Sequence, residues 1–265
     1  MLDLSAPLVM GILNVTDDSF YDGGQFTNPD KMLAHAGKML AEGAAIIDIG
    51  GQSTRPGAHM IDEKEEAERV IPALRLLKKK FADAVFSVDT FYSSVAEAAI
   101  KEGASIINDI SGGTMDEGMF GIVARYKVPY VLMHMQGNPQ TMQKNPVYAN
   151  VTGEVMDYFS QKISALRSMG VNDIIIDPGF GFGKTLEHNY SLLADLHMFR
   201  FFELPVLCGL SRKSMVGKVL NISPADALNG TTVLNTIALL KGANILRVHD
   251  VKQAAEAVKI VNSLH

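Results

Sequence analysis

The sequence predicts an α/β fold, a (β/α)8 TIM barrel built as a single domain over residues 1–265. Short apolar runs alternate eight times with helical segments, and such alternation is typical of a parallel sheet. The runs are nearly all apolar, as expected for strands that are covered on both faces. Eight strand–helix units also match a barrel of roughly 250 residues. A doubly wound open sheet is the structural alternative.

Each of the eight expected strands is an apolar run that ends at or near a polar side chain. In chain order they cover residues 8–14, 45–50, 84–89, 105–110, 129–134, 173–177, 205–210 and 244–249. Side chains alternate between the two faces of a strand. In the last strand, Arg247 and His249 are therefore expected to point inward. Leu246 and Val248 are expected to face the helices.

Helical segments are expected between these strands. They cover residues 28–43, 62–80, 93–103, 151–170, 186–201 and 226–242. The segment 62–80 has acids in its early turns and lysines in its last, which suits the helix dipole, and Pro72 is expected to kink it. The segment 93–103 begins at a serine cap. The segment 226–242 is apolar on most sides, which indicates a buried helix or a subunit contact.

Composition excludes several classes of function. A net charge of -5 and a pI near 5.8 weigh against a nucleic-acid binder. One cysteine, Cys208, rules out a disulfide framework and favours a reducing compartment. The first residues lack the basic region of a signal peptide, and no apolar run approaches the ~18 residues of a membrane span. We therefore expect a cytoplasmic protein that does not bind nucleic acid or membranes.

Polar side chains at the strand ends predict the position of the site. In a barrel, the carboxyl ends of the strands meet at one mouth, where active sites are built. The side chains in question are Asn14, Asp48, Asp89, Asn108, Asp109, His134, Asp177, Ser211, Arg212, Lys213, Arg247 and His249. A buried carboxylate is costly unless it is paired, so this many polar groups at one rim indicate a binding pocket.

The chemistry of these side chains narrows the kind of ligand. Asp89, Asn108 and Asp177 can hydrogen-bond the edge of a planar amide or amidine. Arg247 and His249 follow the last strand, in the region where barrels often hold phosphate. The pattern therefore predicts a flat heterocycle and an anionic group in one pocket.

Several of the remaining polar residues are given less weight. Asp48 precedes two glycines and is more readily a structural group that caps a helix or orients a loop. Arg212 is more readily a solvated neighbour of Lys213, and Ser211 or Ser214 is a candidate cap for the next helix. His134 stays ambiguous.

The glycine-rich stretch "DPGFGFGK" at residues 177–184 matches neither a P-loop nor a dinucleotide-binding fingerprint. Its glycines permit a tight loop, and Phe180 or Phe182 can supply an aromatic wall. No metal-binding motif is present that would form a cage from protein ligands alone. Mg2+ carried by a phosphorylated substrate, with Asn14 as one ligand, remains open.

Eight motifs in order resemble dihydropteroate synthase over nearly the whole chain. They are "MGILNVTDDSFYDGG", "DIGGQSTRPGA", "SVDT", "INDISGG", "MHMQGNPQTMQ", "DPGFGFGK", "GLSRKS" and "RVHD". The resemblance implies a barrel that is usually a homodimer. It also implies a transferase that joins 6-hydroxymethyl-7,8-dihydropterin diphosphate to p-aminobenzoate, with Mg2+, giving 7,8-dihydropteroate and diphosphate in folate biosynthesis.

The resemblance also implies roles for individual residues. The pterin positions are Asp89, Asn108, Ile110, Met133, Asp177, Gly209 and Lys213. The p-aminobenzoate positions are Thr54, Arg55, Pro56, Phe182 and Ser214. The diphosphate positions are Asn14, Arg55, Arg247 and His249, with Asn14 also on Mg2+. The catalytic positions are Asp89, Lys213, Arg247 and His249.

The chain departs from the family pattern in two loops. Asp17 and Tyr21 replace the usual Pro and Ser of the first loop, and Gln52 stands where Glu is frequent. Two other functions remain as alternatives, a pterin-dependent corrinoid methyltransferase and a non-catalytic pterin-binding protein. The "STRPG" and "SRKS" motifs favour an arylamine acid acceptor over the first, and Lys213, Arg247 and His249 weigh against the second.

Overall fold

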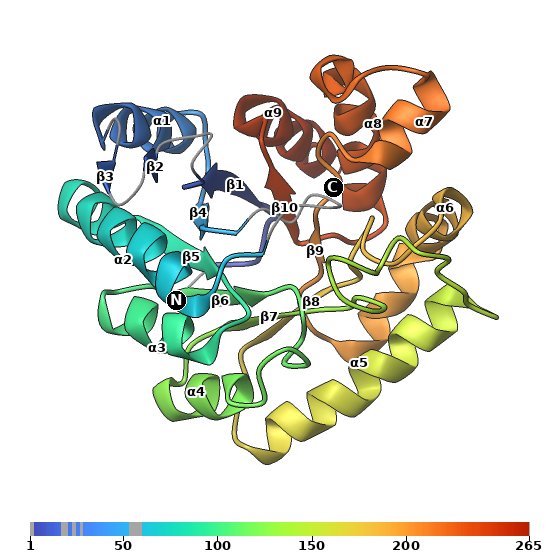
Figure 1. The fold of residues 1–265 in the computed structure, drawn as a ribbon. Coiled ribbons are helices and arrows are strands. Elements are labelled where there is room, and N and C mark those ends of the chain that lie inside the picture. The colour runs from blue at the N-terminus through green and yellow to red at the C-terminus, as the bar shows by residue number, and fades with distance from the viewer. Residues whose placement is uncertain (1–2, 17–20, 23–24, 27–28, 53–59, 265) are drawn as a thin grey trace.

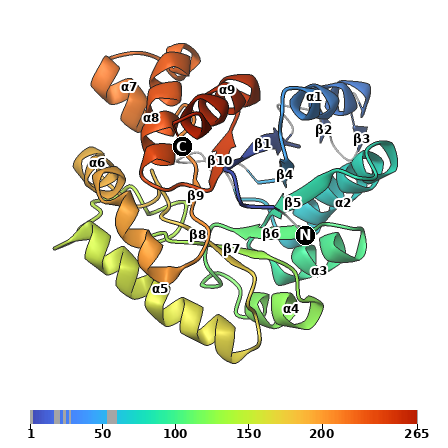
Figure 2. The same cartoon turned by 180° about the vertical axis from the view of Figure 1, so that it is seen from behind.

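The computed structural model describes residues 3–16, 21–22, 25–26, 29–52 and 60–264. Eight parallel strands lie side by side in the order β8-β7-β6-β5-β4-β1-β10-β9, and helices surround them (Figures 1 and 2). The strands are β1 (Leu8–Asn14), β4 (Ile46–Gly50), β5 (Val85–Asp89), β6 (Ile106–Asp109), β7 (Tyr130–Met133), β8 (Ile174–Asp177), β9 (Leu207–Cys208) and β10 (Ile245–Val248). A short antiparallel pair, β2 (Tyr21–Asp22) and β3 (Gln25–Phe26), follows β1.

The two ends of this sheet meet, so the strands form a nearly closed barrel. One bridge joins Ile176 of β8 to Val206, which precedes β9. The amide of Ile176 also donates to the carbonyl of Pro205 at 2.9 Å. This closure confirms the predicted barrel and excludes the open sheet.

The helices follow the strands as expected, with several differences in detail. They are α1 (Pro29–Ala41), α2 (Glu63–Lys80), α3 (Ser93–Lys101), α4 (Met119–Tyr126), α5 (Val151–Ser168), α6 (Leu186–Ala194), α7 (Ser214–Leu220), α8 (Leu228–Leu240) and α9 (Val251–Asn262), with 3-10 turns η1 (Leu196–Phe202) and η2 (Pro224–Asp226). The sequence patterns missed α4, α7 and α9. The helix expected over 186–201 divides into α6 and η1, and α2 continues through Pro72.

The serine cap expected for α3 is wrong. Tyr92 occupies the N-cap position and makes no side-chain cap. The Asp116 carboxylate accepts from the amide of Ser93 at 2.7 Å instead. The free backbone N–H at the start of α3 is therefore satisfied by a carboxylate far along the chain, and not by the serine cap that the local sequence suggested.

Two apolar layers hold the barrel together. Inside the barrel, one residue from nearly every strand contributes to a single buried cluster of Met10, Ile46, Ile106, Val131, Ile175, Leu207 and Ile245. The alternate residues pack outward against the helices, and Leu246 and Val248 are among them, as predicted. Each fully buried side chain of this kind contributes roughly 1.5–3 kcal/mol.

The inner layer also determines which side chains reach the mouth. Two residues beyond it, on the same inward face, stand Asp48, Asn108, Met133, Asp177, Gly209 and Arg247. Most of the inward positions that follow the inner apolar layer are therefore polar or lack a side chain. Among the described helices, none has the length and apolar character needed to cross a membrane.

Candidate active site

Arg247 occupies the centre of the polar mouth and contacts two carboxylates. Its Nε donates to Asp48 Oδ2 at 2.6 Å, and its Nη2 donates to Asp89 Oδ2 at 2.6 Å. The same Asp48 oxygen accepts from Asn108 Nδ2 at 3.0 Å. Strands β4, β5, β6 and β10 thus meet through one network at their carboxyl ends.

The structure corrects the interpretation of Asp48. This residue is fully buried, and it neither caps a helix nor orients a loop. Its side chain holds Arg247 and Asn108 in place, so it belongs to the site. A partner 199 positions away cannot be recognised from the residues around Asp48.

Burial and charge oppose each other in this network. Desolvation raises the pKa of Asp89 to about 7, and the charge of Arg247 acts against this rise. Desolvation also disfavours the charged form of Arg247, but Asp48 and Asp89 outweigh it and raise the Arg247 pKa. The guanidinium therefore stays charged, and it binds the two carboxylates through different nitrogens.

Asn14 lies beside the Arg247 network at the end of β1. A side chain added at Gly50 would place its Cβ 3.5 Å from Asn14 Oδ1 and 3.6 Å from Asp89 Cβ. The side chains of Asn14 and Asp89 therefore border the same space above Gly50. The predicted diphosphate position and the predicted pterin position adjoin here.

Asp177 stands at the mouth at the end of β8. Its Oδ1 accepts from the amide of Gly179 at 2.7 Å. Desolvation raises the Asp177 pKa, while the Gly179 amide and the charge of Lys213 oppose the rise. A buried acceptor at this place suits a ligand that brings N–H donors.

Lys213 lies where the chain leaves β9, the strand that pairs with β10 and its Arg247, and enters α7. Its ammonium donates to the carbonyl of Phe180 and lies 4.3 Å from the centre of the Phe182 ring. Burial lowers its pKa to about 8, against the opposing charge of Asp177. The expected caps at Ser211 and Ser214 are wrong, because Lys213 itself is the N-cap and Ser214 is exposed at the start of α7.

An apolar wall completes the pocket. Phe91, Ile110 and Met133 form a buried cluster, against which Phe182 packs. Across the barrel, a Cβ added at Gly209 would meet no heavy atom of the described chain within 4 Å. Ile110, Met133 and Phe182 therefore form an apolar group, and the space at Gly209 is open.

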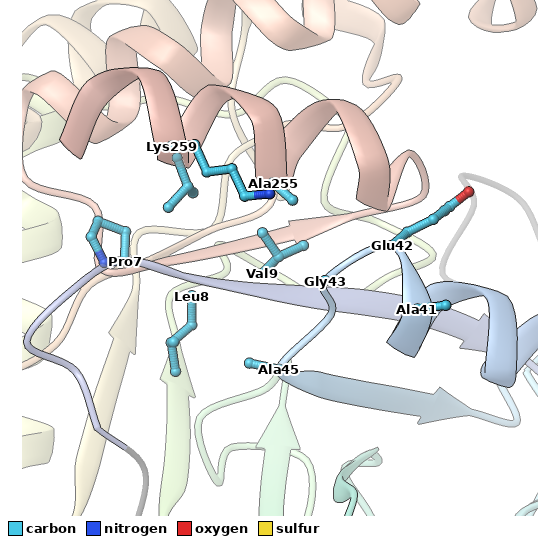
Figure 3. A pocket seen from close by; sticks show the side chains of 10 residues that line it. Pro7, Leu8, Val9, Ala41, Glu42, Gly43, Ala45, Ala255 and Lys259 are labelled. Carbon is cyan, nitrogen blue, oxygen red and sulfur yellow. The ribbon is translucent and has the colours of Figure 1, made fainter. Parts of the chain in front are cut away.

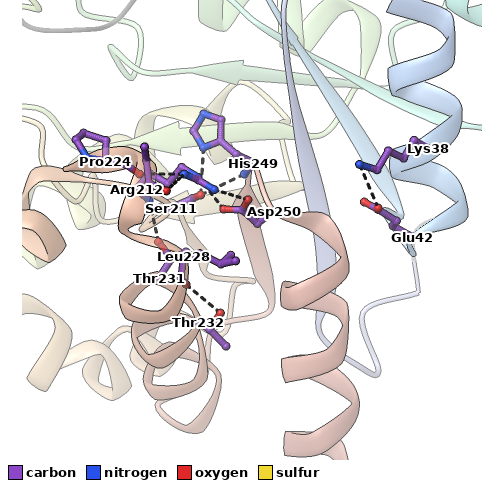
Figure 4. A network of polar contacts seen from close by, with 11 residues as sticks. Lys38, Glu42, Ser211, Arg212, Pro224, Leu228, Thr231, Thr232, His249 and Asp250 are labelled. Carbon is purple, nitrogen blue, oxygen red and sulfur yellow. Dashed lines mark hydrogen bonds and ion pairs between the residues drawn. The ribbon is translucent and has the colours of Figure 1, made fainter. Parts of the chain in front are cut away.

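His249 lies one residue beyond β10 and is exposed. Its Nδ1 is 3.1 Å from Ser211 Oγ, and its amide donates to the same oxygen at 3.2 Å (Figure 4). Ser211 therefore orients the His249 ring from the neighbouring loop. Arg247 reaches inward as expected, but His249 stands at the rim.

The interpretation of Arg212 as a solvated neighbour is wrong. Its Nε and Nη2 form a fork on Asp250 at 2.9 and 2.8 Å (Figure 4). Its Nη1 donates to the carbonyls of Pro224 and Ala225, each at 2.9 Å. The residue adopts the left-handed region, with φ 53°, which non-glycine residues rarely do. These contacts hold the bend that sends Lys213 toward the mouth.

Three further polar residues received no functional role from the sequence. Lys184, the last residue of the glycine-rich stretch, is only 3% exposed and lies 3.0 Å from His134 Nδ1. Burial lowers the His134 pKa to about 3, so its ring is neutral and can accept from Lys184. Asp109 faces outward and accepts from Tyr130, Ser111 and Gly113. His134 and Asp109 are therefore bound by neighbouring protein groups.

The second long loop is described only at its ends. Thr54, Arg55 and Pro56, three predicted p-aminobenzoate positions, lie outside the described residues, as do Asp17 and the side chain of Tyr21. Gln52 is buried and bridges to Ile61. Its Nε2 donates to the Ile61 carbonyl at 3.0 Å, and its Oε1 accepts from the Ile61 amide at 3.1 Å. A carboxamide can make both bonds, whereas an ionised glutamate would lack the donor.

A separate hollow lies at the opposite end of the strands. It is bordered by Pro7, Leu8, Ala45 and Ala255, with Lys259 and Glu42 at its edge (Figure 3). None of the polar residues of the mouth lines it. We therefore place the functional site at the carboxyl ends of the strands.

Comparison with known proteins agrees with this geometry. The family model described as "Pterin binding enzyme" matches residues 10–249. Dihydropteroate synthase of Escherichia coli (strain K12) is 48% identical over 99% of this chain and 93% of its own length. The crystal structure of Yersinia pestis dihydropteroate synthase with a sulfonamide drug is 47% identical, with a TM-score of 0.93 over 99% of this chain and 96% of that one.

A second solved relative contains a bound pterin compound. Xanthomonas albilineans dihydropteroate synthase in complex with 7,8-dihydropteroate is 38% identical, with a TM-score of 0.88 over 99% of this chain and 95% of that one. Each alignment covers nearly the full length of this chain and of the relative. The chain belongs to the dihydropteroate synthase family of pterin-binding enzymes.

Proposed function

We propose that this protein condenses 6-hydroxymethyl-7,8-dihydropterin diphosphate with p-aminobenzoate to give 7,8-dihydropteroate and diphosphate. The observation that carries the proposal is the arrangement of Asp89, Asn108, Asp177, Lys213 and Arg247 around one mouth. These groups combine acceptors for a pterin edge with cations for an anionic leaving group. Relatives that share this fold include enzymes solved with 4-aminobenzoic acid and with 7,8-dihydropteroate.

The pterin edge presents an amino group and a ring N–H to the protein. The Asp177 carboxylate accepts from both, while Asn108 and Asp89 meet other nitrogens of the ring. Hydrogen bonds to a charged acceptor contribute about 1.5–3 kcal/mol each. Ile110 and Met133 cover one face of the ring, and the open side at Gly209 admits it.

The bond between the pterin methylene carbon and the diphosphate oxygen breaks, and the leaving group carries the electron pair away. Arg247 and His249 stabilise its negative charge. A guanidinium has five N–H groups, so Arg247 can contact phosphate oxygens while Asp48 holds its Nε. The methylene carbon left behind is stabilised by resonance with the pterin ring.

The amine of p-aminobenzoate then forms the new C–N bond and releases a proton. An arylamine is already neutral at pH 7, so this step requires no strong base. Phe182 and Ser214, with Thr54, Arg55 and Pro56 of the second loop, are proposed to hold the p-aminobenzoate. Exclusion of water protects the reactive carbon until the amine arrives.

Mg2+ fits this site as a companion of the diphosphate. The Asn14 side chain offers a hard amide oxygen beside the Arg247 network, and Mg2+ is commonly held by one or two protein oxygens together with substrate phosphates. When bound, the ion supplies further neutralisation of the leaving group. The described residues contain no cluster of three or more acidic, histidine or cysteine ligands, so the phosphates would have to complete the coordination.

A homodimer in the cytoplasm is also proposed. Val219 and Leu220 of α7, Val233 and Leu240 of α8, and Ile260 of α9 are large apolar side chains exposed to solvent. A second copy would cover such side chains. The single cysteine, Cys208, is buried and free, which suits a reducing compartment. Sedimentation of the purified protein tests the dimer, and cell fractionation tests the location.

One assay tests the reaction and separates it from its alternatives. The purified protein is incubated with pterin diphosphate, p-aminobenzoate and Mg2+, and both dihydropteroate and released diphosphate are measured. Equal amounts of the two products support the proposal. Methyl transfer to a corrinoid acceptor would support the methyltransferase instead, and pterin binding without turnover would support a binding protein.

A further inference from the structure

The loop after β8 folds back tightly against the segment after β7. Gly179 and Gly183 both lie in the left-handed region, with φ 70° and 60°. A side chain at Gly179 would collide with the carbonyl of His134, and one at Gly183 would come within 2.6 Å of the carbonyl of Gln136. Only glycine fits both the conformation and the space at these two positions.

Lys184 ends this loop and turns its ammonium back inside it. Its Nζ donates to the carbonyls of Gly179 and Phe182, each at 3.0 Å. The Nδ1 atom of His134 lies at 3.0 Å and the carbonyl of His134 at 3.4 Å. Four acceptors thus surround one ammonium, which has three N–H groups to share among them.

The loop and the cation depend on each other energetically. Burial lowers the pKa of Lys184 to about 7, while the charge of Asp177 opposes this. A buried charge is strongly unfavourable without partners, and the loop carbonyls provide them. Conversely, without Lys184 the inward carbonyls of Gly179 and Phe182 would lose a charged donor.

Other contacts hold the outer side of the same loop. Gln143 donates to the carbonyl of Gly181 at 2.6 Å, and Tyr148 donates to that of Gly183 at 2.8 Å. These bonds anchor the loop to the neighbouring segment 137–149. The inward carbonyls turn to Lys184 instead, so the two sides of the loop have different anchors.

This loop carries three contacts of the proposed active site. The Gly179 amide donates to Asp177, the Phe180 carbonyl accepts from Lys213, and the Phe182 ring lies below the Lys213 ammonium. A shift of the inner carbonyls would therefore move the groups that face both substrates.

We propose that Lys184 is a positioning residue, an internal cation around which residues 178–184 fold and which thereby places Phe182 and Lys213 for the second substrate. The proposal rests on the proposed synthase reaction for its kinetic consequence. Its structural part concerns the loop alone and does not require turnover. Lys184 does not touch the reacting atoms.

Hydrogen exchange of the free enzyme tests the structural part. Lys184→Met keeps most of the side-chain volume and removes the ammonium, and Lys144→Met removes an exposed lysine from the neighbouring segment as a control. The amides of residues 179–183 are expected to exchange at least tenfold faster in Lys184→Met and at the wild-type rate in Lys144→Met. Unchanged exchange in a folded Lys184→Met protein would overturn the proposal.

Steady-state kinetics test the positioning role. In Lys184→Met, the KM for p-aminobenzoate is expected to rise at least fivefold, with kcat at saturation within threefold of wild type. A fall in thermal stability with both constants unchanged would mean a merely structural residue and would overturn the proposal. If the wild-type enzyme itself forms no dihydropteroate, the proposed reaction fails, and the exchange experiment still decides the role of Lys184 in the loop.

Chemical rescue gives an independent readout. Lys184→Ala removes three side-chain carbons and the ammonium group. The n-propylammonium ion has the same three carbons and the same charge, so it can fill the space that the substitution leaves. Added n-propylammonium is expected to restore at least a third of the lost affinity for p-aminobenzoate, whereas propanol and potassium chloride do not. Equal effects of all three additives would overturn the need for a buried cation. If Lys184→Ala does not fold, the Lys184→Met measurements decide the question.

Discussion

Replacing Asp48 with asparagine should lower catalytic efficiency by loosening Arg247. The Asp48 carboxylate is fully buried and accepts from Arg247 Nε at 2.6 Å and from Asn108 at 3.0 Å. Asparagine has nearly the same shape and retains one oxygen acceptor, but it has no charge. The guanidinium then keeps only Asp89 as a charged partner.

The size of the effect follows from the difference between a charged and a neutral acceptor. A hydrogen bond to a charged group contributes about 1.5–3 kcal/mol, and it is roughly twice as strong as a neutral one. The substitution therefore removes about half of that contribution, ~0.8–1.5 kcal/mol. At 1.36 kcal/mol per factor of ten, kcat/KM should fall roughly 4- to 13-fold.

A double-mutant cycle on diphosphate release measures the coupling. The four proteins are wild type, Asp48→Asn, Arg247→Met and the double variant, with Ser87→Ala as a control for a buried polar residue on the inward face of β5. Asp48→Asn should cost activity in the wild-type background and nearly nothing once Arg247 is gone. Equal losses in both backgrounds would refute the idea that Asp48 acts through Arg247.

Three further substitutions have defined outcomes. Asp177→Asn should weaken pterin binding by at least ~1.5 kcal/mol in calorimetry, and unchanged affinity would remove this residue from the pterin edge. Gln52→Glu should reduce the free energy of unfolding by ~1–3 kcal/mol in a denaturant titration, because the Ile61 carbonyl loses its donor; a stability equal to wild type would contradict this. Asp250→Ala should remove the ion pair of Arg212 and lower the free energy of unfolding by ~1–2 kcal/mol, a value discounted for the partial exposure of the pair. It should also lower kcat in the synthase assay; full activity would show that the bend before Lys213 does not depend on this ion pair.

The barrel could be predicted from the sequence because its signals are local. Each strand is a short apolar run, and its alternation leaves a polar residue such as Asp177 at the inward end. The inner and outer layers of the core follow from the same alternation, as Leu246 and Val248 show. Missing α4 changed nothing in the topology, because parallel strands β6 and β7 already demand a crossover between them. Missing α9 changed nothing either, because this helix follows the last strand.

The partners of individual side chains could not be predicted in this way. Asp48 was undervalued because its cation comes from the other end of the chain. The partner of Arg212, Asp250, lies 38 positions away, so the residues around Arg212 indicate only a solvated charge. Lys184 ends a glycine-rich motif, and nothing in the local pattern indicates that its ammonium is buried. In each case a tertiary contact, not the local residue pattern, gives the side chain its role.

The closure of the barrel between β8 and β9 has a consequence for ligand binding. A single bridge joins these strands, and regions with few backbone hydrogen bonds open at the lowest energetic cost. Asp177 ends β8 and Lys213 follows β9, and the contact of Lys213 with the Phe180 carbonyl joins the loops that leave the two strands. A pterin bound between those loops would stabilise the contact between β8 and β9. Proteolysis near these two strands should therefore be slower in the ligand-bound enzyme than in the free enzyme.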